Sequence, residues 1–196
     1  MNIFLTSQAS RVLDKIVEML PKPPRELRVA FIPTASDPYE EHPWLDEDRA
    51  KFIELGFNVI DFDLKYKTED ETRQALKNFD ILFVAGGNTF YLLSEARKSG
   101  FCKVAKEMVE AGKIYIGSSA GSYIACPTIE AATWKNPEKE RFGLVDLRAL
   151  CFVDFILTAH YKDKYKDAVA EGKKTSRYRV VVLTDEQFVD KDGKIY

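Results

Sequence analysis

Short apolar runs recur along the chain, and longer segments of mixed apolar and polar residues separate them. The runs are rich in β-branched and aromatic residues and are mostly apolar on both faces, which is typical of buried strands. The predicted strands are residues 3–6, 29–33, 59–62, 81–85, 114–117, 155–158 and 180–183. Strands that are buried on both faces and alternate with helices form parallel sheets. The pattern therefore predicts an α/β fold with three layers (α/β/α) and a mostly parallel central sheet.

The segments between the strands carry apolar residues at helical spacing. Helices are predicted at residues 10–20, 47–55 and 101–112. Thr68 stands three residues before Glu71, which predicts a capping box at the start of a further helix. Near the end of the chain, the tight-turn sequence around Gly193 predicts a short antiparallel β-hairpin. The chain has no internal repeat and no linker-like tract, so we expect one domain over residues 1–196.

The composition is that of a globular protein, since 45% of the 196 residues are hydrophobic and 31% are charged. A net charge of −2 argues against a nucleic-acid-binding domain, which would carry a basic face. No apolar run reaches the roughly 18–20 residues of a membrane span, and the N-terminus lacks the pattern of a signal peptide. Cys102, Cys126 and Cys151 are widely spaced and outside any CxxC motif, which predicts free thiols in a reducing compartment. We therefore expect a cytoplasmic protein that binds neither nucleic acid nor membranes.

In parallel sheets, ligands bind beyond the C-terminal ends of the strands, so the residues that follow the strands are the first candidates for chemistry. Residues 117–121 read G-S-S-A-G and fit the pattern G-x-S-x-G, with Ser119 at the centre. This pattern lifts a nucleophilic serine to the tip of a sharp turn between a strand and a helix, where neighbouring side chains would collide. The alternative is a small-residue turn in which the serines only cap the helix. Ser118 is the weaker nucleophile candidate because it lies on the strand side of the turn.

A second glycine-rich loop, A-G-G-N-T at residues 85–89, also follows a strand and opens a helix. The backbone N–H groups of Gly87 and Ala120 are candidates for an oxyanion hole, the pair of donors that acyl transfer requires. Asn88 and Thr89 are candidates for the helix cap and for contacts with a substrate. The loop does not read G-x-G-x-x-G, so it gives no reason to expect a dinucleotide.

A serine nucleophile needs a general base, and the chain has only two histidines. His160 ends the predicted strand 155–158 at the edge where ligands bind, whereas His42 lies in a loop before a helix. His160 is therefore the candidate base. With so few histidines and no H-E-x-x-H motif, neither a zinc site nor any other cofactor is expected.

The third member of a triad is an acid that orients the imidazole. Asp185 and Glu186 follow the last predicted core strand, and Asp154 precedes the strand of His160. The sequence leaves these three open. An acid after His160 gives the order Ser, His, acid, which differs from the order Ser, acid, His of α/β-hydrolases.

Together these segments resemble the peptidase E (aspartyl dipeptidase) family of serine peptidases. The resemblance covers nearly the whole chain and is carried by the pair G-G-N-T-F at 86–90 and G-S-S-A-G at 117–121, with the strand of His160 and L-T-D-E at 183–186. It implies a fold like that of the class I glutamine amidotransferases, which is flavodoxin-like. It also implies Ser119 as nucleophile and His160 as base, with Gly87 and Ala120 as oxyanion donors. The family's acid is a glutamate, whereas Asp185 stands at that position here, with Glu186 beside it.

The resemblance further implies a cleavage of dipeptides with an N-terminal aspartate, whose side chain calls for a nearby cation. The candidates are Arg177 first, then Lys173, Lys174 and Arg141. Residues 131–140 do not follow the family pattern and are expected to shape a different pocket. We expect a serine exopeptidase that acts on small peptides as a monomer or homodimer. The alternatives are a catalytically weak member that binds a small ligand, and an amidase or esterase with the same serine and histidine.

Overall fold

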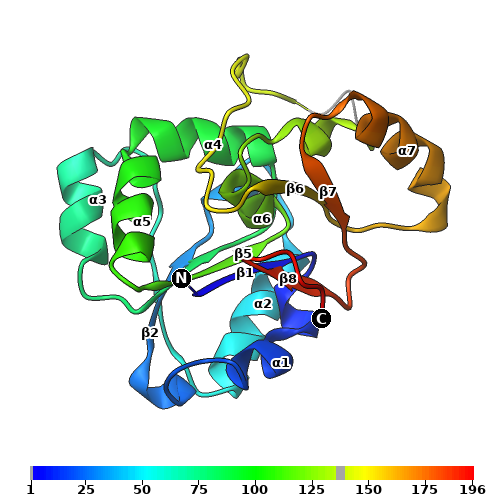
Figure 1. Cartoon of the computed structure of the whole chain (residues 1–196). Coiled ribbons are helices and arrows are strands. Elements are labelled where there is room, and N and C mark those ends of the chain that lie inside the picture. Colours follow the sequence, from blue (N-terminus) through cyan, green and yellow to red (C-terminus); the bar gives the residue numbers. More distant parts are fainter. Residues whose placement is uncertain (1, 136–139) are drawn as a thin grey trace.

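The computed structural model describes residues 2–135 and 140–196, and its centre is a sheet of six strands (Figure 1). The strands are β1 (Asn2–Thr6), β2 (Arg28–Ile32), β3 (Asn58–Asp61), β4 (Ile81–Val84), β5 (Ile114–Ser118) and β8 (Phe188–Asp190). Their order is β3-β2-β4-β5-β1-β8. The first five are parallel and β8 is antiparallel to β1. The mostly parallel central sheet predicted from the apolar runs is confirmed.

Helices cover both faces of this sheet, so the fold has the predicted three layers (Figure 1). The helices are α1 (Leu13–Val17), α2 (Pro43–Glu54), α3 (Glu69–Leu76), α4 (Thr89–Lys98), α5 (Phe101–Glu110), α6 (Ala120–Ala125) and α7 (Lys166–Thr175). Side chains alternate along each strand. On β4, Ile81 and Phe83 pack with the apolar residues of α1 and α2, whereas Leu82 and Val84 pack with those of α3 to α6. This alternation makes two hydrophobic cores, one on each side of the sheet.

The ends of the helices follow local sequence signals. At α3, Oγ1 of Thr68 accepts a hydrogen bond from the N–H of Glu71, and the Glu71 carboxylate accepts one from the N–H of Thr68, which confirms the capping box. Helix α2 begins at Pro43, four residues before the predicted start, because proline suits the first helical turn. The helix predicted at residues 10–20 is instead a 3₁₀ turn followed by the short α1. The 3₁₀ turns are Ala9–Arg11, Pro24–Glu26, Thr34–Ser36, Glu130–Thr133 and Asp163–Tyr165.

The strands predicted at 155–158 and 180–183 exist, but they lie outside the central sheet. β6 (Phe155–Thr158) and β7 (Arg179–Val182) pair in parallel as a separate two-stranded sheet, with α7 as their connection. The place beside β1 is taken by β8, which returns antiparallel to it. After β8, the chain turns at Gly193, and the backbones of Phe188 and Tyr196 exchange hydrogen bonds, which confirms the C-terminal hairpin.

The structure also describes several single features of the sequence. All three cysteines are free, as predicted. Trp134 is partly buried and packs over Gly172 of α7, where a Cβ atom would lie 2.3 Å from the indole ring. Within the described residues, no helix is long and apolar enough to cross a membrane. Residues 136–139 of the segment that departs from the family pattern lie outside the described residues.

Candidate active site

Ser119 stands between β5, which ends at Ser118, and α6, which begins at Ala120. Its backbone has φ 47° and ψ −105°, a strained combination for a residue with a side chain. The N–H of Ser119 donates to the carbonyl of Thr6 at 3.0 Å, which fixes the turn against the end of β1. The geometry is that of a nucleophile turn, in which the strand runs abruptly into a helix.

The glycines of the motif let α6 lie directly on the sheet. A Cβ atom at Gly121 would lie 2.0 Å from the carbonyl oxygen of Val84 on β4, and one at Gly117 would lie 2.7 Å from the carbonyl oxygen of Gly121. No side chain fits at such distances. The small residues therefore serve close packing of helix on strand, which holds Ser119 above the C-terminal edge of the sheet.

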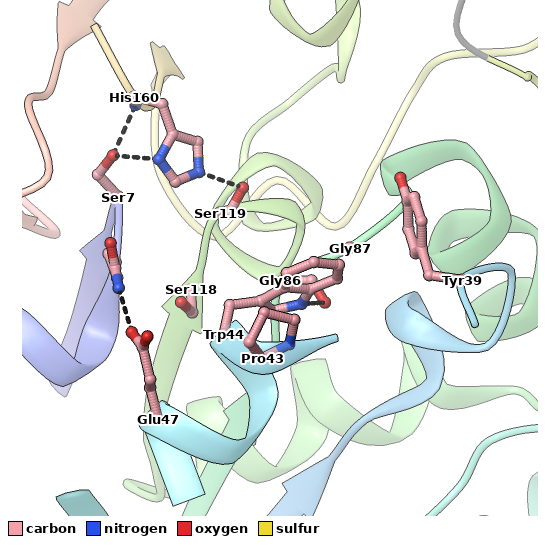
Figure 2. Close-up of a pocket in the computed structure, with 11 residues that line it drawn as sticks. Ser7, Tyr39, Pro43, Trp44, Glu47, Gly86, Gly87, Ser118, Ser119 and His160 are labelled. Carbon is pink, nitrogen blue, oxygen red and sulfur yellow. Dashed lines mark hydrogen bonds between the residues drawn. The ribbon is translucent and has the colours of Figure 1, made fainter. Parts of the chain in front are cut away.

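His160 and Asp185 come from the small sheet and meet Ser119 at this edge. His160 follows β6, and its Nε2 atom lies 2.9 Å from Oγ of Ser119 (Figure 2). Asp185 follows β7, and its Oδ1 atom lies 2.6 Å from Nδ1 of His160. An ionised carboxylate only accepts hydrogen bonds, so Nδ1 carries the proton and Nε2 accepts the one from Ser119. This tautomer is the one that a general base requires.

The two titratable groups are tuned by burial and by each other. Burial lowers the pKa of His160, Asp185 raises it in part, and the charges of Lys135 and Lys162 lower it further, so that it stays below its ordinary value. Burial alone would raise the pKa of Asp185. The hydrogen bond and charge of His160, together with a hydrogen bond from Ser7, hold that pKa below its ordinary value instead. At neutral pH the pair is therefore a neutral imidazole beside a carboxylate.

Ser7 is a site residue that the sequence analysis missed. It follows the last residue of β1 and is fully buried. Its hydroxyl donates to Oδ1 of Asp185 at 2.9 Å and accepts from the backbone N–H of His160 at 2.6 Å. One sequence signal was available, since Thr6 and Ser7 are polar residues at the C-terminal end of an apolar parallel strand.

Two hollows open at Ser119 and His160, and both residues line each of them. The larger has a volume of about 460 Å³, and Tyr39, Pro43 and Trp44 form the apolar part of its wall. Besides Ser119 and His160, its lining residues are Ser7, Gln8, Tyr39, Pro43, Trp44, Glu47, Gly86, Gly87 and Ser118 (Figure 2). The smaller has a volume of about 200 Å³ and is completed by Thr89, Tyr123, Ala132, Lys135 and Tyr165. The two hollows therefore share Ser119 and His160 as part of their walls.

The glycine-rich loop after β4 forms one wall beside the serine. A Cβ atom at Gly86 would lie 3.3 Å from Cβ of Ser119, so the two loops touch. Gly87 has φ 144°, and a Cβ atom there would lie 2.1 Å from the carbonyl oxygen of Ala35, so this position requires glycine. Gly87 lines the larger hollow, and Ala120 is the first residue of α6 beside the nucleophile. The role of these two N–H groups as oxyanion donors stays a prediction.

Asn88 and Thr89, both predicted substrate contacts, differ in position. Oδ1 of Asn88 accepts from the N–H groups of Phe90 and Tyr91, and its Nδ2 donates to the carbonyl of Glu140. Both ends of this amide are thus engaged in holding the loop and capping α4. Thr89 lines the smaller hollow, beside Ser119 and His160.

Of the three acids that the sequence left open, only Asp185 meets the imidazole. Glu186 stands beside Asp185 in the turn between β7 and β8, but its side chain is exposed and its carboxylate lies 4.0 Å from Arg11. Asp154 precedes β6, pairs with Arg179 at 3.9 Å and is 91% exposed. It lies at the N-terminal end of the strand whose C-terminal end leads to His160, so β6 separates the two. The expectation that placed Glu186 in the site is therefore corrected.

The predicted substrate cations also lie elsewhere. Arg177 precedes β7, at the end of the small sheet opposite Asp185, and donates to the hydroxyl of Tyr178 at 2.8 Å. Lys174 pairs with Glu171. Lys173 lines a separate surface hollow beside α7, and Arg141 lies over the ring of Phe90. None of these four lines either hollow at Ser119.

The cation that does line a hollow at Ser119 is Lys135, which the sequence analysis did not single out. Its ammonium group donates to the carbonyl of Ala159, the residue before His160, and lies 5.5 Å from the centre of the Tyr165 ring. Besides His160, it is the one ionisable cation among those lining residues of the smaller hollow that the structure describes. Residues 2–135 and 140–196 contain no cluster of three or more His, Cys, Asp or Glu side chains suited to a metal ion.

Known proteins match this chain along its length. The sequence profile of peptidase family S51 matches residues 3–194. An uncharacterized peptidase of Listeria innocua is 31% identical over 201 residues, which span 97% of this chain and 96% of that protein. Peptidase E of Shewanella amazonensis is 34% identical over 133 residues, or 68% of this chain and 53% of that protein. The crystal structure of a candidate peptidase E from Listeria monocytogenes superposes with a TM-score of 0.87 at 29% identity, covering 100% of this chain and 96% of that one.

Proposed function

The chain belongs to peptidase family S51 and is a serine peptidase, and we propose that it is an exopeptidase that cleaves small peptides with an N-terminal aspartate through Ser119, His160 and Asp185. The observation that carries this proposal is the continuous hydrogen-bonded line from Oγ of Ser119 through both ring nitrogens of His160 to Asp185, at 2.9 and 2.6 Å. A nucleophile, a base and an orienting acid in this order are what acyl transfer to serine requires.

In the proposed reaction, Oγ of Ser119 attacks the scissile carbonyl carbon as its proton passes to Nε2 of His160. The oxygen of the tetrahedral intermediate gains negative charge, and the N–H groups of Gly87 and Ala120 are the proposed donors to it. The carbon–nitrogen bond then breaks, and the leaving amine takes the proton from Nε2. A water molecule repeats the sequence on the acyl-enzyme and releases the N-terminal residue. Asp185 remains ionised throughout and stabilises the imidazolium.

The proposed preference for aspartate rests on Lys135. The smaller hollow has room for one side chain of modest size, and Lys135 supplies a positive charge in its wall. A carboxylate on the substrate would gain a charge-assisted hydrogen bond there, beside the carbonyl to be attacked. The larger hollow, with Trp44 and Pro43 in its wall, suits the residue that leaves. Lys135 thus takes the role that the sequence analysis gave to Arg177.

Two measurements test the proposal. A fluorophosphonate probe should label Ser119, as peptide mapping would show, and Ser119→Ala should abolish both labelling and hydrolysis while the far-UV spectrum stays unchanged. Ser99→Ala is the matched control, because Ser99 lines neither hollow and its hydroxyl donates to the carbonyl of Glu95. Activity that survives in Ser119→Ala would overturn the assignment of the nucleophile.

A substrate panel separates the proposal from its rivals. Asp-X dipeptides should be hydrolysed faster than Ala-X dipeptides, esters or simple amides of the same size. Faster turnover of the esters or amides would favour an amidase or esterase with the same serine and histidine. Absence of labelling and of turnover on the whole panel would favour a protein that binds a small ligand without catalysis.

A further inference from the structure

The hydroxyl of Ser7 contacts both the proposed base and the proposed acid. It accepts a hydrogen bond from the backbone N–H of His160 at 2.6 Å and donates one to Oδ1 of Asp185 at 2.9 Å. The same oxygen lies 3.4 Å from Nδ1 of the imidazole (Figure 2). The hydroxyl thus donates one hydrogen bond and accepts one, and its distance to Nδ1 is longer because the Nδ1 proton is directed at Asp185. Its direct partners are therefore groups of the reaction machinery.

These contacts cross from one sheet to the other. His160 and Asp185 follow β6 and β7, which pair with each other and with no strand of the central sheet in the described part of the chain. Ser7 follows β1 of the central sheet. The preceding residue, Thr6, accepts the backbone N–H of Ser119 at 3.0 Å. The end of β1 thus holds the nucleophile with one residue and the base and the acid with the next.

The backbone of His160 needs such a support. Its φ is 55°, in the left-handed region that residues with a side chain rarely occupy and that persists only where surrounding contacts enforce it. The N–H of His160 has its hydrogen-bond partner in Ser7, and the neighbouring N–H groups of Ala159 and Tyr161 have theirs in the Tyr123 hydroxyl and the Leu183 carbonyl. Of these three partners, Ser7 alone also contacts Asp185.

We propose that Ser7 is a positioning residue, which holds the His160–Asp185 pair in register with Ser119 across the two sheets. The role rests on the proposed function, since it concerns the same three groups. Without the Ser7 hydroxyl, the small sheet still carries both side chains, but the imidazole and the carboxylate lose their common contact with the central sheet. A displacement of about 1 Å at the reacting atoms is enough to lower a rate by about 10²-fold.

The test compares Ser7→Ala, Ser7→Cys and Ser7→Thr by the rate at which a fluorophosphonate probe labels Ser119, a readout that needs no knowledge of the natural substrate. We expect labelling to slow by about 10²-fold in the Ala and Cys variants. The Thr variant keeps the hydroxyl and should retain most of the wild-type rate. Ser99→Ala is the matched control. Ser99 is fully buried, as Ser7 is, but its hydroxyl donates to the backbone carbonyl of Glu95.

A proton NMR signal gives a second, independent readout. The proton between Nδ1 of His160 and Asp185 should resonate at low field in the wild type and in Ser99→Ala, and should shift or broaden in Ser7→Ala. The other histidine, His42, precedes α2, and within residues 2–135 and 140–196 the histidine–carboxylate pair is that of His160 and Asp185. This readout still decides the role of Ser7 if Ser7→Thr does not fold.

The outcomes separate the two proposals. Wild-type labelling rates and an unchanged low-field signal in Ser7→Ala and Ser7→Cys would overturn the role of Ser7 and leave the proposed function standing. Slow labelling in Ser99→Ala equal to that in Ser7→Ala would also overturn it, because the effect would then belong to any lost buried hydroxyl. If wild-type Ser119 is not labelled at all, the proposed function fails, and the NMR signal alone tests the contact of Ser7 with the pair.

Discussion

Nδ1 of His160 and Oδ1 of Asp185 lie 2.6 Å apart, while the opposite ring nitrogen meets Ser119. The contact fixes which nitrogen carries the proton, because the carboxylate can only accept. An amide at position 185 can instead donate to Nδ1, and this would put the ring proton on Nε2, where it blocks proton transfer from Ser119.

Asp185→Asn should therefore lower kcat by about 10³- to 10⁴-fold with little change in KM. Steady-state kinetics on an Asp-X dipeptide measure this effect. The adjacent Glu186→Gln is the control, since Glu186 is exposed near Arg11, and it should leave kcat within about two-fold. If the two variants lose activity equally, Asp185 is not the acid that orients the His160 imidazole.

The pH profile should follow the titration of His160. The base acts as the neutral imidazole, and burial together with Lys135 and Lys162 keeps its pKa below the ordinary value, against the opposing effect of Asp185. We therefore expect kcat/KM to rise with pH through a midpoint below about 6.5 and to level off at neutral pH. Lys162→Met removes one cation and should move the midpoint upward. A wild-type midpoint above that of an ordinary histidine would contradict the effect of burial.

Lys135→Met should remove the preference for an acidic side chain. We expect kcat/KM on Asp-X dipeptides to fall by about 10- to 100-fold, the range of a lost hydrogen bond to a charged group. Because Lys135 also donates to the carbonyl of Ala159, unchanged turnover of Ala-X dipeptides is the check that His160 has not moved. Lys164→Met is the control, since Lys164 lies 4.9 Å from the same Tyr165 ring but does not line the hollow. An equal loss on both substrates would assign Lys135 a structural role.

Gly121→Ala should damage the fold itself. The added Cβ atom would lie 2.0 Å from the carbonyl oxygen of Val84, so α6 must move off β4. We expect a loss of about 3 kcal/mol or more of unfolding free energy, which lowers Tm by about 6 °C or more for a chain of this size. Gly56→Ala is the comparison: no atom lies within 4 Å, and only its φ of 85° opposes a side chain. If thermal melts show a lower Tm for Gly56→Ala than for Gly121→Ala, the close contact between α6 and β4 does not determine the stability of the fold.

The sequence was enough to predict the parts of the site that depend on local chain geometry. Ser119 stands at the centre of a five-residue pattern that is typical of a strand-to-helix turn, and Gly117 of that pattern lies against Gly121 in the same turn. His160 could be chosen because the chain has only two histidines and a strand leads directly to it. The layers of the fold followed from apolar runs, since strands buried on both faces need helices on both sides.

The remaining site residues depend on contacts between distant segments. Asp185 and Glu186 are neighbours, and only the path of the chain after β7 decides which carboxylate points at the imidazole. The apolar pattern of β6 and β7 shows that they are strands but not which strands they pair with, so their separate sheet was not foreseen. The role of Ser7 depends on how that sheet docks against β1, and that of Lys135 on the chain between α6 and β6.

The division of the machinery between two sheets has a consequence for heat inactivation. Ser119 follows a strand of the large sheet, whereas His160 and Asp185 follow the two short strands that α7 connects. β6 is buried in the main core, but β7 and α7 are largely exposed, and exposed segments open at a lower free energy than the whole molecule unfolds. On warming, turnover should therefore cease at a temperature where circular dichroism still reports an intact fold, and should return on cooling as the small unit docks again.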